Sequence, residues 1–417
     1  MDNFYGFNIF NVGKYIHPKI LPNLASPKLI QKSAAMQLII KTKNILTCLI
    51  FMAFLAGNSF TVQALTVANA TEKVSQDTSS HKKGEKESFN AGEMIIEHIT
   101  DAYEWHIATI GETHITIPFP VILVWEGKLY TFCSSKFHHG QEAYQGFKIC
   151  HDKGPNKGKI IHVSKDANGN EIADTKLPLD FSITKVVFAL LFSIVLISLI
   201  FISVARSYKK RRGMAPKGLQ SLLEPLIIFV RDDIAKSSLG EKYEKYTPYL
   251  LTVFFFIFIN NLLGLVPFFP GGANVTGNLA VTGVLAVLTF VITSVGASKD
   301  YWLHIVNPPV PTWLKLPVPL MPIVELIGVF TKPFVLMVRL FANITAGHII
   351  ALGFMSLIFI FGNMNVGLGY GVSVVSVFFA IFMGLLELLV AFIQAYVFTL
   401  LTSLYFGMAM EKHHKGH

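Results

Sequence analysis

Residues 320–361 read LMPIVELIGVFTKPFVLMVRLFANITAGHIIALGFMSLIFIF, and residues 373–410 read SVVSVFFAIFMGLLELLVAFIQAYVFTLLTSLYFGMAM. Both stretches are apolar over about 40 residues, which makes a helix roughly 60 Å long at about 1.5 Å per residue. Because this is twice the roughly 30 Å of a hydrocarbon core, two such helices stay in a membrane only if they are strongly tilted. Residues 362–369 between them, rich in glycine and asparagine, are typical of a turn. We therefore expect a tilted antiparallel helical hairpin.

Only four charged side chains occur between residues 318 and 410: Glu325, Lys332, Arg339 and Glu387. A charge at the bilayer centre costs about 2.5–3.5 kcal/mol on insertion scales, so each is expected to have a partner or a function. Arg339 lies near the middle of its stretch and cannot easily reach an interface. Lys332 can extend to the interface or pair with Glu325 on the same helix face, and we expect a structural role for it.

Helical geometry sorts the polar side chains of the hairpin into two levels. At about 100° per residue, Asn343 lies about 40° from Arg339, whereas His348 lies about 180° away. On the second helix, Glu387 and Gln394 are two turns apart on one face. One turn position places Arg339 level with Gln394 and His348 level with Glu387. The sequence therefore predicts a His348/Glu387 level near the turn and a deeper level with Arg339, Asn343 and Gln394.

The two levels suit different chemistry. Imidazole titrates near neutral pH, so His348 beside the Glu387 carboxylate is an arrangement that can relay protons within a membrane. Arg339 stays charged at ordinary pH and instead lowers the pKa of a carboxylate that approaches it. Structural alternatives remain for each residue. They are a static Arg339–Glu387 ion pair, a core histidine, and interhelical hydrogen bonds from Asn343 and Gln394.

Three further apolar spans, at residues 186–205, 248–267 and 279–296, complete an all-α polytopic membrane region with about five membrane helices. Basic residues with no acid among them follow the first span, from Arg206 to Lys217. By the positive-inside rule this end is cytoplasmic, and counting crossings then puts the C-terminus in the cytoplasm as well.

Two polar features interrupt the remaining membrane region. Residues 219–236 have an amphipathic helical pattern and are expected to lie along the inner surface. Asn260 and Asn261 occur within the second span, where we expect interhelical hydrogen bonds.

Residues 65–180 precede the first span and have the composition of a small, water-exposed α+β domain, which the topology makes extracytoplasmic. Amphipathic spacing predicts a helix over residues 91–107, and β-like runs occur at residues 113–124 and 159–163. Cys133 and Cys150 fall within this domain and are either disulfide-bonded or reduced.

Residues 1–64 form an N-terminal extension with a signal-like segment that begins at Met36. The segment is either cleaved near Ala64, in which case Met36 is a candidate start, or kept as an anchor. With residues 181–417 as the membrane domain, we expect a multi-pass protein of a bacterial inner membrane.

The composition of the 417-residue chain excludes several classes of protein. With 52% hydrophobic and only 15% charged residues, it is too apolar for a wholly water-soluble protein. Three cysteines are too few for a disulfide scaffold or a cysteine-rich zinc domain, and we expect neither a metal nor another cofactor. The net charge of +9 fits a membrane surface rather than nucleic acid, because basic residues cluster beside apolar spans. No G-x-x-x-x-G-K-[ST] phosphate loop occurs, so no nucleotide binding is expected.

The residues from Arg339 to His348, RLFANITAGH, resemble the signature of subunit a of the F-type ATP synthase membrane sector. Residues 248–267 (PYLLTVFFFIFINNLLGLVP) and 218–233 (GLQSLLEPLIIFVRDD) resemble two further blocks of that family. The likeness covers about residues 180–412. The long N-terminal region departs from familiar members and is similar to that of Bacteroidetes-like bacteria.

The resemblance implies a non-catalytic, ion-translocating subunit with two aqueous half-channels. Protons enter from outside, reach a carboxylate on a rotating ring of c subunits, and leave on the inner side. The residues expected along this path are His348, Glu387, Asn343, Gln394 and, on the inner side, Glu325. Arg339 keeps the ring carboxylate ionised and blocks direct leakage. The implied partners are the c ring, the b subunit of the peripheral stalk, the remaining ATP synthase subunits and membrane lipid.

Two other functions remain open from the residues themselves. A secondary cation or proton transporter could use a buried Arg/Glu/His site, although no inverted repeat is visible in the sequence. A membrane anchor for the extracytoplasmic domain would need no charges in the hairpin.

Overall fold

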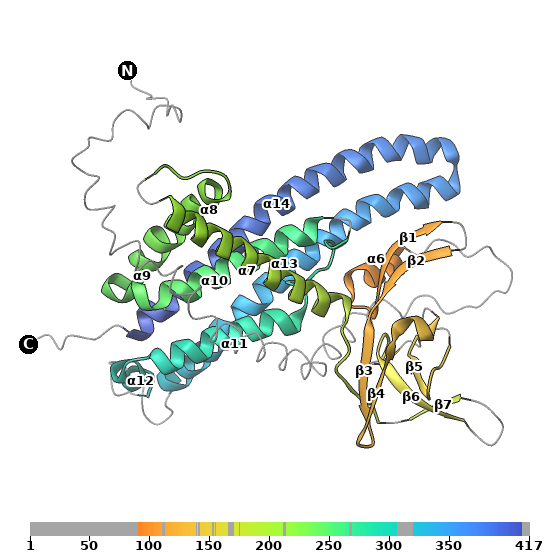
Figure 1. Cartoon of the computed structure of the whole chain (residues 1–417), viewed down its shortest axis with the longest axis horizontal. Coiled ribbons are helices and arrows are strands. Elements are labelled where there is room, and N and C mark those ends of the chain that lie inside the picture. Colours follow the sequence, from red (N-terminus) through yellow and green to blue (C-terminus); the bar gives the residue numbers. More distant parts are fainter. Residues whose placement is uncertain are drawn as a thin grey trace, which may run out of the picture.

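The computed structural model describes residues 91–110, 113–138, 140, 142–151, 154, 156–165, 171–174, 176–211, 214–266, 269–306 and 320–410. They form a bundle of long helices with a small β-rich domain at one end (Figure 1). The predicted signal-like segment, from Met36 to Ala64, lies outside the described residues.

Five helical stretches of the described chain are long and apolar enough to cross a membrane, as predicted. They contain the helices α7 (Lys185–Lys210), α10 (Tyr243–Leu265), α11 (Leu279–Gly296), α13 (Leu320–Met364) and α14 (Val366–Met410). The side chains of Thr184 and Asn278 accept hydrogen bonds from the first turns of α7 and α11, so these two helices begin at capping residues.

Short helical segments gather at the end of the bundle away from the β-rich domain (Figure 1). They are α8 (Leu219–Ile228), the π-helical η4 (Phe229–Lys236), α9 (Ser237–Leu239), η5 (Gly240–Lys242) and α12 (Lys299–Val306). The predicted amphipathic segment forms α8 and η4, and these pack against α7 and α10. We name this end of the bundle the short-helix end and the other the β-domain end.

Helices α13 and α14 form the predicted antiparallel hairpin, but its turn is much shorter than residues 362–369. Only Asn365 separates the two helices. Its Oδ1 accepts a hydrogen bond from Gly367 N at 2.8 Å and so caps α14. The glycines allow close approach instead of breaking the helices, because a Cβ on Gly369 would lie 2.8 Å from Gly362 Cα.

Helix α10 lies at the centre of the helical bundle. Its side chains Phe254 and Phe255 are almost completely buried. Phe255 packs edge-to-face on Phe201 of α7 at 4.9 Å, and Phe254 packs on Phe392 of α14 at 6.1 Å between ring centroids. Helices α13 and α14, in contrast, present many apolar side chains outward, Phe378 among them. Such surfaces suit lipid or a membrane partner.

The β-rich domain has three small antiparallel sheets, in the orders β1-β2, β4-β3-β8 and β5-β6-β7. Its elements are α6 (Ala91–Ile99), β1 (Glu104–Ile110), β2 (Thr113–Pro118), β3 (Pro120–Trp125), β4 (Lys128–Cys133), η3 (Ser134–Phe137), β5 (Phe147–Ile149), β6 (Ile160–Lys165), β7 (Glu171–Ala173) and β8 (Leu179–Asp180). Val121, Leu123 and Phe147 are fully buried at its core. The α+β class predicted for this domain agrees with these elements.

One element of this domain differs from the prediction. The helix predicted over residues 91–107 ends at Ile99, and strand β1 begins at Glu104. Helical spacing was outweighed by the antiparallel pairing of β1 with β2 and by the burial of Trp105, which is 6% exposed. The β-like runs at residues 113–124 and 159–163 are confirmed as β2, β3 and β6. Cys133 and Cys150 are free thiols.

Candidate functional site

Arg339 lies midway along α13 and is exposed on the surface of the chain. Its neighbours Leu336 and Leu340 are each 1% exposed and fix the helix against the bundle. Within the described residues, no ion pair joins Arg339 to a carboxylate. The static Arg339–Glu387 ion pair considered from the sequence is therefore not formed there, and the guanidinium is open to a partner.

Glu387 and His348 lie where the hairpin register predicts. Phe354 of α13 stacks on Phe379 of α14 at 5.3 Å, which fixes the register near the turn. Deeper in the hairpin, Glu387 packs on Gly347, where a Cβ would lie 3.0 Å from Glu387 Cγ. His348 is the next residue, and both ionisable side chains are half-buried. The absence of a side chain at residue 347 thus brings the carboxylate to the backbone beside His348.

Helix α10 borders the same group of residues. A Cβ on Gly264 would lie 3.7 Å from His348 Nε2 and 3.7 Å from the carbonyl oxygen of Ala273. One turn earlier, Asn261 Nδ2 donates to the carbonyl of Ala391 in α14 at 3.3 Å. Three segments, α10, α13 and the loop before α11, therefore meet around Gly264, and α14 joins them through the hydrogen bond of Asn261.

The two asparagines of α10 have different roles. Asn261 forms the predicted interhelical hydrogen bond, and its Oδ1 also accepts from Thr276 Oγ1 at 2.6 Å. Asn260 instead donates to the carbonyl of Phe256 in its own helix at 2.8 Å. The expectation of an interhelical bond is therefore confirmed for one residue and wrong for the other, because only one of two adjacent helical residues faces a given neighbour.

The three segments that meet around Gly264 each carry a buried polar atom. Asn260 Oδ1, Asn274 Nδ2 and Thr345 Oγ1 are buried and have no hydrogen-bond partner among the described residues. Buried polar atoms of this kind are normally satisfied by protein or by water. Asn274 and Thr345 were not predicted from the sequence, since neither charge nor spacing distinguishes them from ordinary loop and helix residues.

The deeper predicted level is divided between the interior and the surface. Gln394 is 5% exposed and faces the bundle beside the buried Ala391 and Ala395. Arg339 and Asn343, in contrast, are exposed. No hydrogen bond joins Gln394 to Arg339 in the described chain. The structure therefore places Glu387 against the backbone of Gly347, the residue before His348, and it does not join Arg339 to Gln394 in the described chain.

A second polar region lies at the short-helix end. Glu325, Lys332 and Arg339 recur every seven residues and so form one stripe along α13. Lys332 Nζ is 5.6 Å from the ring centroid of Tyr405 in α14. No ion pair joins Lys332 to Glu325 within the described residues, so the lysine is placed by a cation–π contact instead.

Lys332 also lines a cavity between α11, α12, α13 and α14. The lining residues are Thr289, Phe290, Thr293, Ser294, Tyr301, Val329, Lys332, Pro333 and Tyr405. Burial, and then the negative charge of Glu325, raise the pKa of the Tyr301 hydroxyl. Glu325 is thus close enough to act on Tyr301, one of five hydroxyl-bearing residues in the mixed lining of the cavity.

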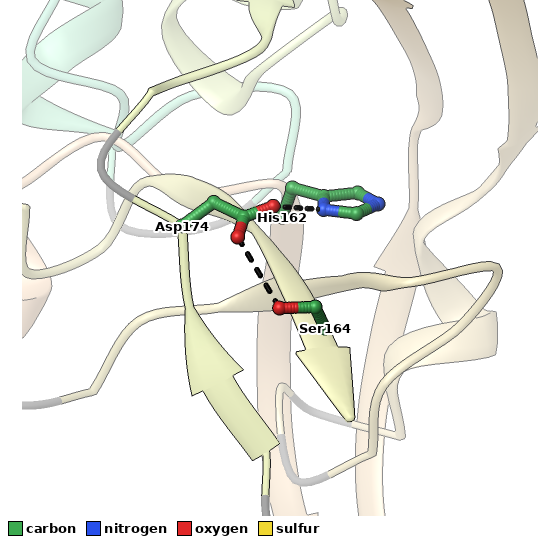
Figure 2. Close-up of polar contacts among 3 residues, drawn as sticks. All are labelled: His162, Ser164 and Asp174. Atoms are coloured by element: carbon green, nitrogen blue, oxygen red, sulfur yellow. Dashed lines mark hydrogen bonds and ion pairs between the residues drawn. The ribbon is translucent and has the colours of Figure 1, made fainter. Parts of the chain in front are cut away.

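The β-rich domain contains a separate polar cluster (Figure 2). His162 Nδ1 is 2.6 Å from Asp174 Oδ2, and Ser164 Oγ donates to Asp174 Oδ1 at 3.2 Å. Because the serine bonds to the carboxylate and not to the imidazole, this is not the arrangement of a hydrolytic triad. No group of three His, Cys, Asp or Glu side chains in the described part of the chain could hold a metal ion.

Comparison with known proteins assigns the two parts of the chain to different families. Residues 186–407 match the family described as ATP synthase A chain. Residues 94–181 match a domain of unknown function, DUF8433. The first match covers more than half of the chain and includes every candidate residue of the hairpin.

Similar proteins carry one name. A protein named ATP synthase subunit a from Chloroherpeton thalassium is 44% identical over 264 residues, covering 62% of this chain and 72% of that protein. Another of that name, from Myxococcus xanthus, is 45% identical over 249 residues, covering 57% of this chain and 77% of its own. ATP synthase subunit a 2 from Prosthecochloris aestuarii is 36% identical over 371 residues, covering 88% and 93%. The last match extends well into the N-terminal region.

Proposed function

Because this chain belongs to the ATP synthase subunit a family, we propose that it carries protons across the membrane sector through two half-channels kept apart by Arg339. One observation carries the proposal. Arg339 is exposed, has no ion-pair partner within the described residues, and lies between two separate polar regions of the bundle. Lys332 and His348 are seven and nine residues away, or about 10 and 13 Å along the helix.

The outer half-channel is assigned to the β-domain end. Its proposed relay groups are His348 and Glu387, and the packing of Glu387 on Gly347, the residue before His348, supports this pairing. Asn260, Asn274 and Thr345 contribute buried polar atoms that can bind water along the path. An imidazole beside a carboxylate can relay protons at neutral pH, because a proton moves between the two groups with little change in free energy.

The inner half-channel is assigned to the short-helix end. Tyr301 lines the cavity between α11 and α13, and the negative charge of Glu325 acts on its hydroxyl group. This end also carries the basic residues that follow α7, so it is the cytoplasmic side by the positive-inside rule.

Arg339 acts on a carboxylate of the rotating c ring. A ring carboxylate that comes opposite the guanidinium is held ionised, because an adjacent positive charge lowers its pKa. It must therefore release its proton to the inner half-channel before it passes and take up the next from the outer one. Each proton that crosses contributes about 2.3 kcal/mol per 100 mV of membrane potential.

The subunit itself is non-catalytic in this proposal. Ring subunits face the exposed stripe of α13 and α14, the b subunit of the peripheral stalk holds the chain against rotation, and nucleotide chemistry belongs to other subunits. Gln394 and Asn343 line the region near Arg339 without pairing to it. The β-rich domain lies outside the membrane and the C-terminus in the cytoplasm.

The test is Arg339→Ala in the assembled ATP synthase. We expect ATP-driven acidification of inverted vesicles to be lost while assembly is retained, because nothing then forces the ring carboxylate to deprotonate. Val338→Ala is the matched control, since Val338 is the preceding exposed residue of α13. It should pump normally. Normal pumping by Arg339→Ala would overturn the proposed function.

A further inference from the structure

The β-rich domain is joined to the first residues of α7. Asp101 Oδ1 accepts hydrogen bonds from Val186 N and Ala102 N, both at 3.0 Å, and Lys185 N donates to the carbonyl of Ala102 at 2.8 Å. Burial raises the pKa of the Asp101 carboxyl. Because backbone groups on both sides of the junction bond to each other, the domain is not linked to the bundle by a free tether.

An aromatic cluster extends this junction to the loop between α10 and α11. Trp105 of β1 packs edge-to-face on Phe269 of the loop at 5.3 Å and on Phe188 of α7 at 6.1 Å between ring centroids. Phe188 and Phe269 stack at 5.7 Å, and Phe119 packs on Phe188 at 5.2 Å. Residues from the domain, from α7 and from the loop therefore share one cluster.

Loop residues 269–278 then fold back onto α10. Gly272 N donates to the carbonyl of Leu263 at 3.0 Å, and Thr276 Oγ1 donates to Asn261 Oδ1 at 2.6 Å. The carbonyl of Ala273 lies at the same distance from the Gly264 position as His348 Nε2 does. A continuous series of contacts thus runs from Trp105 through Phe269 and the loop to the surroundings of His348.

A second contact holds the domain in place. Helix α6 packs against α13, the helix that carries His348. Figure 1 shows α6 and β1 lying between the rest of the domain and the hairpin. The domain therefore contacts the bundle at three places: α7, the loop of residues 269–278, and α13.

We propose that the DUF8433 domain is a clamp for the outer half-channel, in which Trp105 and Phe269 position the 269–278 loop beside His348. The inference rests on the proposed function of His348 and Glu387, and it gives the β-rich domain a part in that function. Trp105 and Phe269 are positioning residues, since neither touches the transferred proton. Without their contact, the loop is no longer held against α10. The side chains of Asn261, Asn274 and His348 then lose their positions at the proposed entrance for protons.

The test measures ATP synthesis by the complete ATP synthase in inverted vesicles, whose lumen corresponds to the outer side. Luminal pH is varied while external pH and the potassium diffusion potential are fixed. We expect Phe269→Ala and Trp105→Ala each to raise the luminal proton concentration that gives half-maximal synthesis by about two- to tenfold, the range set by the strength of one aromatic pair. The maximal rate at saturating acid should remain close to that of the parent.

Three controls separate positioning from simple damage. Phe181→Ala removes a ring just after β8, outside the aromatic cluster. Phe181 is 45% exposed, close to the 39% of Phe269, and its removal should leave the dependence of ATP synthesis on luminal proton concentration unchanged. Phe269→Tyr keeps the aromatic contact and should restore the parent curve. The double variant should shift no further than the larger single one, because both changes break one contact. If the alanine variants do not assemble, Phe188→Leu tests the same cluster and should give the same shift.

An unshifted half-maximal concentration, or a lower maximal rate without a shift, would overturn the clamp. Arg339→Ala is measured in parallel so that the two ideas can fail separately. Coupled synthesis retained by that variant contradicts the proposed function. Coupling lost there, together with an unshifted Phe269→Ala curve, contradicts only the clamp.

Discussion

At the residue scale, Glu387 and His348 are placed to exchange roles. The carboxylate packs on Gly347 and the imidazole follows on the next residue, so the two groups lie at neighbouring levels of the hairpin. We expect His348→Glu and Glu387→His each to lower ATP-driven pumping by about a hundredfold or more, because a positioned proton-transfer group typically contributes about 10²–10⁴-fold. The double exchange should pump faster than either single variant. A double variant slower than both in the vesicle assay would mean that the two groups do not act as a pair.

At the element scale, the close packing of α13 on α14 depends on glycine at the turn. A Cβ on Gly369 would lie 2.8 Å from Gly362 Cα, a backbone atom that cannot move aside, whereas a Cβ on Gly371 meets nothing within 4 Å. Gly369→Ala should therefore destabilise the hairpin by about 1–3 kcal/mol, as overpacking does. Gly371→Ala should leave stability equal or higher, since alanine favours helix. Thermal unfolding in detergent measures the difference. Equal midpoints for the two variants would show that the close approach at Gly362 does not limit packing.

At the scale of the whole molecule, the sequence predicted what depends on length, charge and period. Five apolar spans, and an antiparallel hairpin that sets Glu387 within one residue of the level of His348, followed from about 1.5 Å and 100° per residue. Contacts between distant elements could not be predicted in this way. The burial of Asn274 and the Trp105–Phe269 contact depend on how the loop before α11 folds back on α10. The burial of Thr345 depends on how α13 packs against its neighbours. The period of the sequence does not predict either arrangement. The helix predicted over residues 91–107 ends early, at Ile99, for the same reason, because the pairing of β1 with β2 decided the conformation around Trp105.

The exposed guanidinium on α13 also bears on how the rotary machine is put together. In the proposed function, the guanidinium of a chain without its rotor faces lipid, at a depth where a charge costs about 2.5–3.5 kcal/mol. Docking of an acidic ring removes that penalty. On that proposal, part of the driving force for joining stator to rotor is already present in the unassembled polypeptide, and the residue proposed to time proton release also favours completion of the motor.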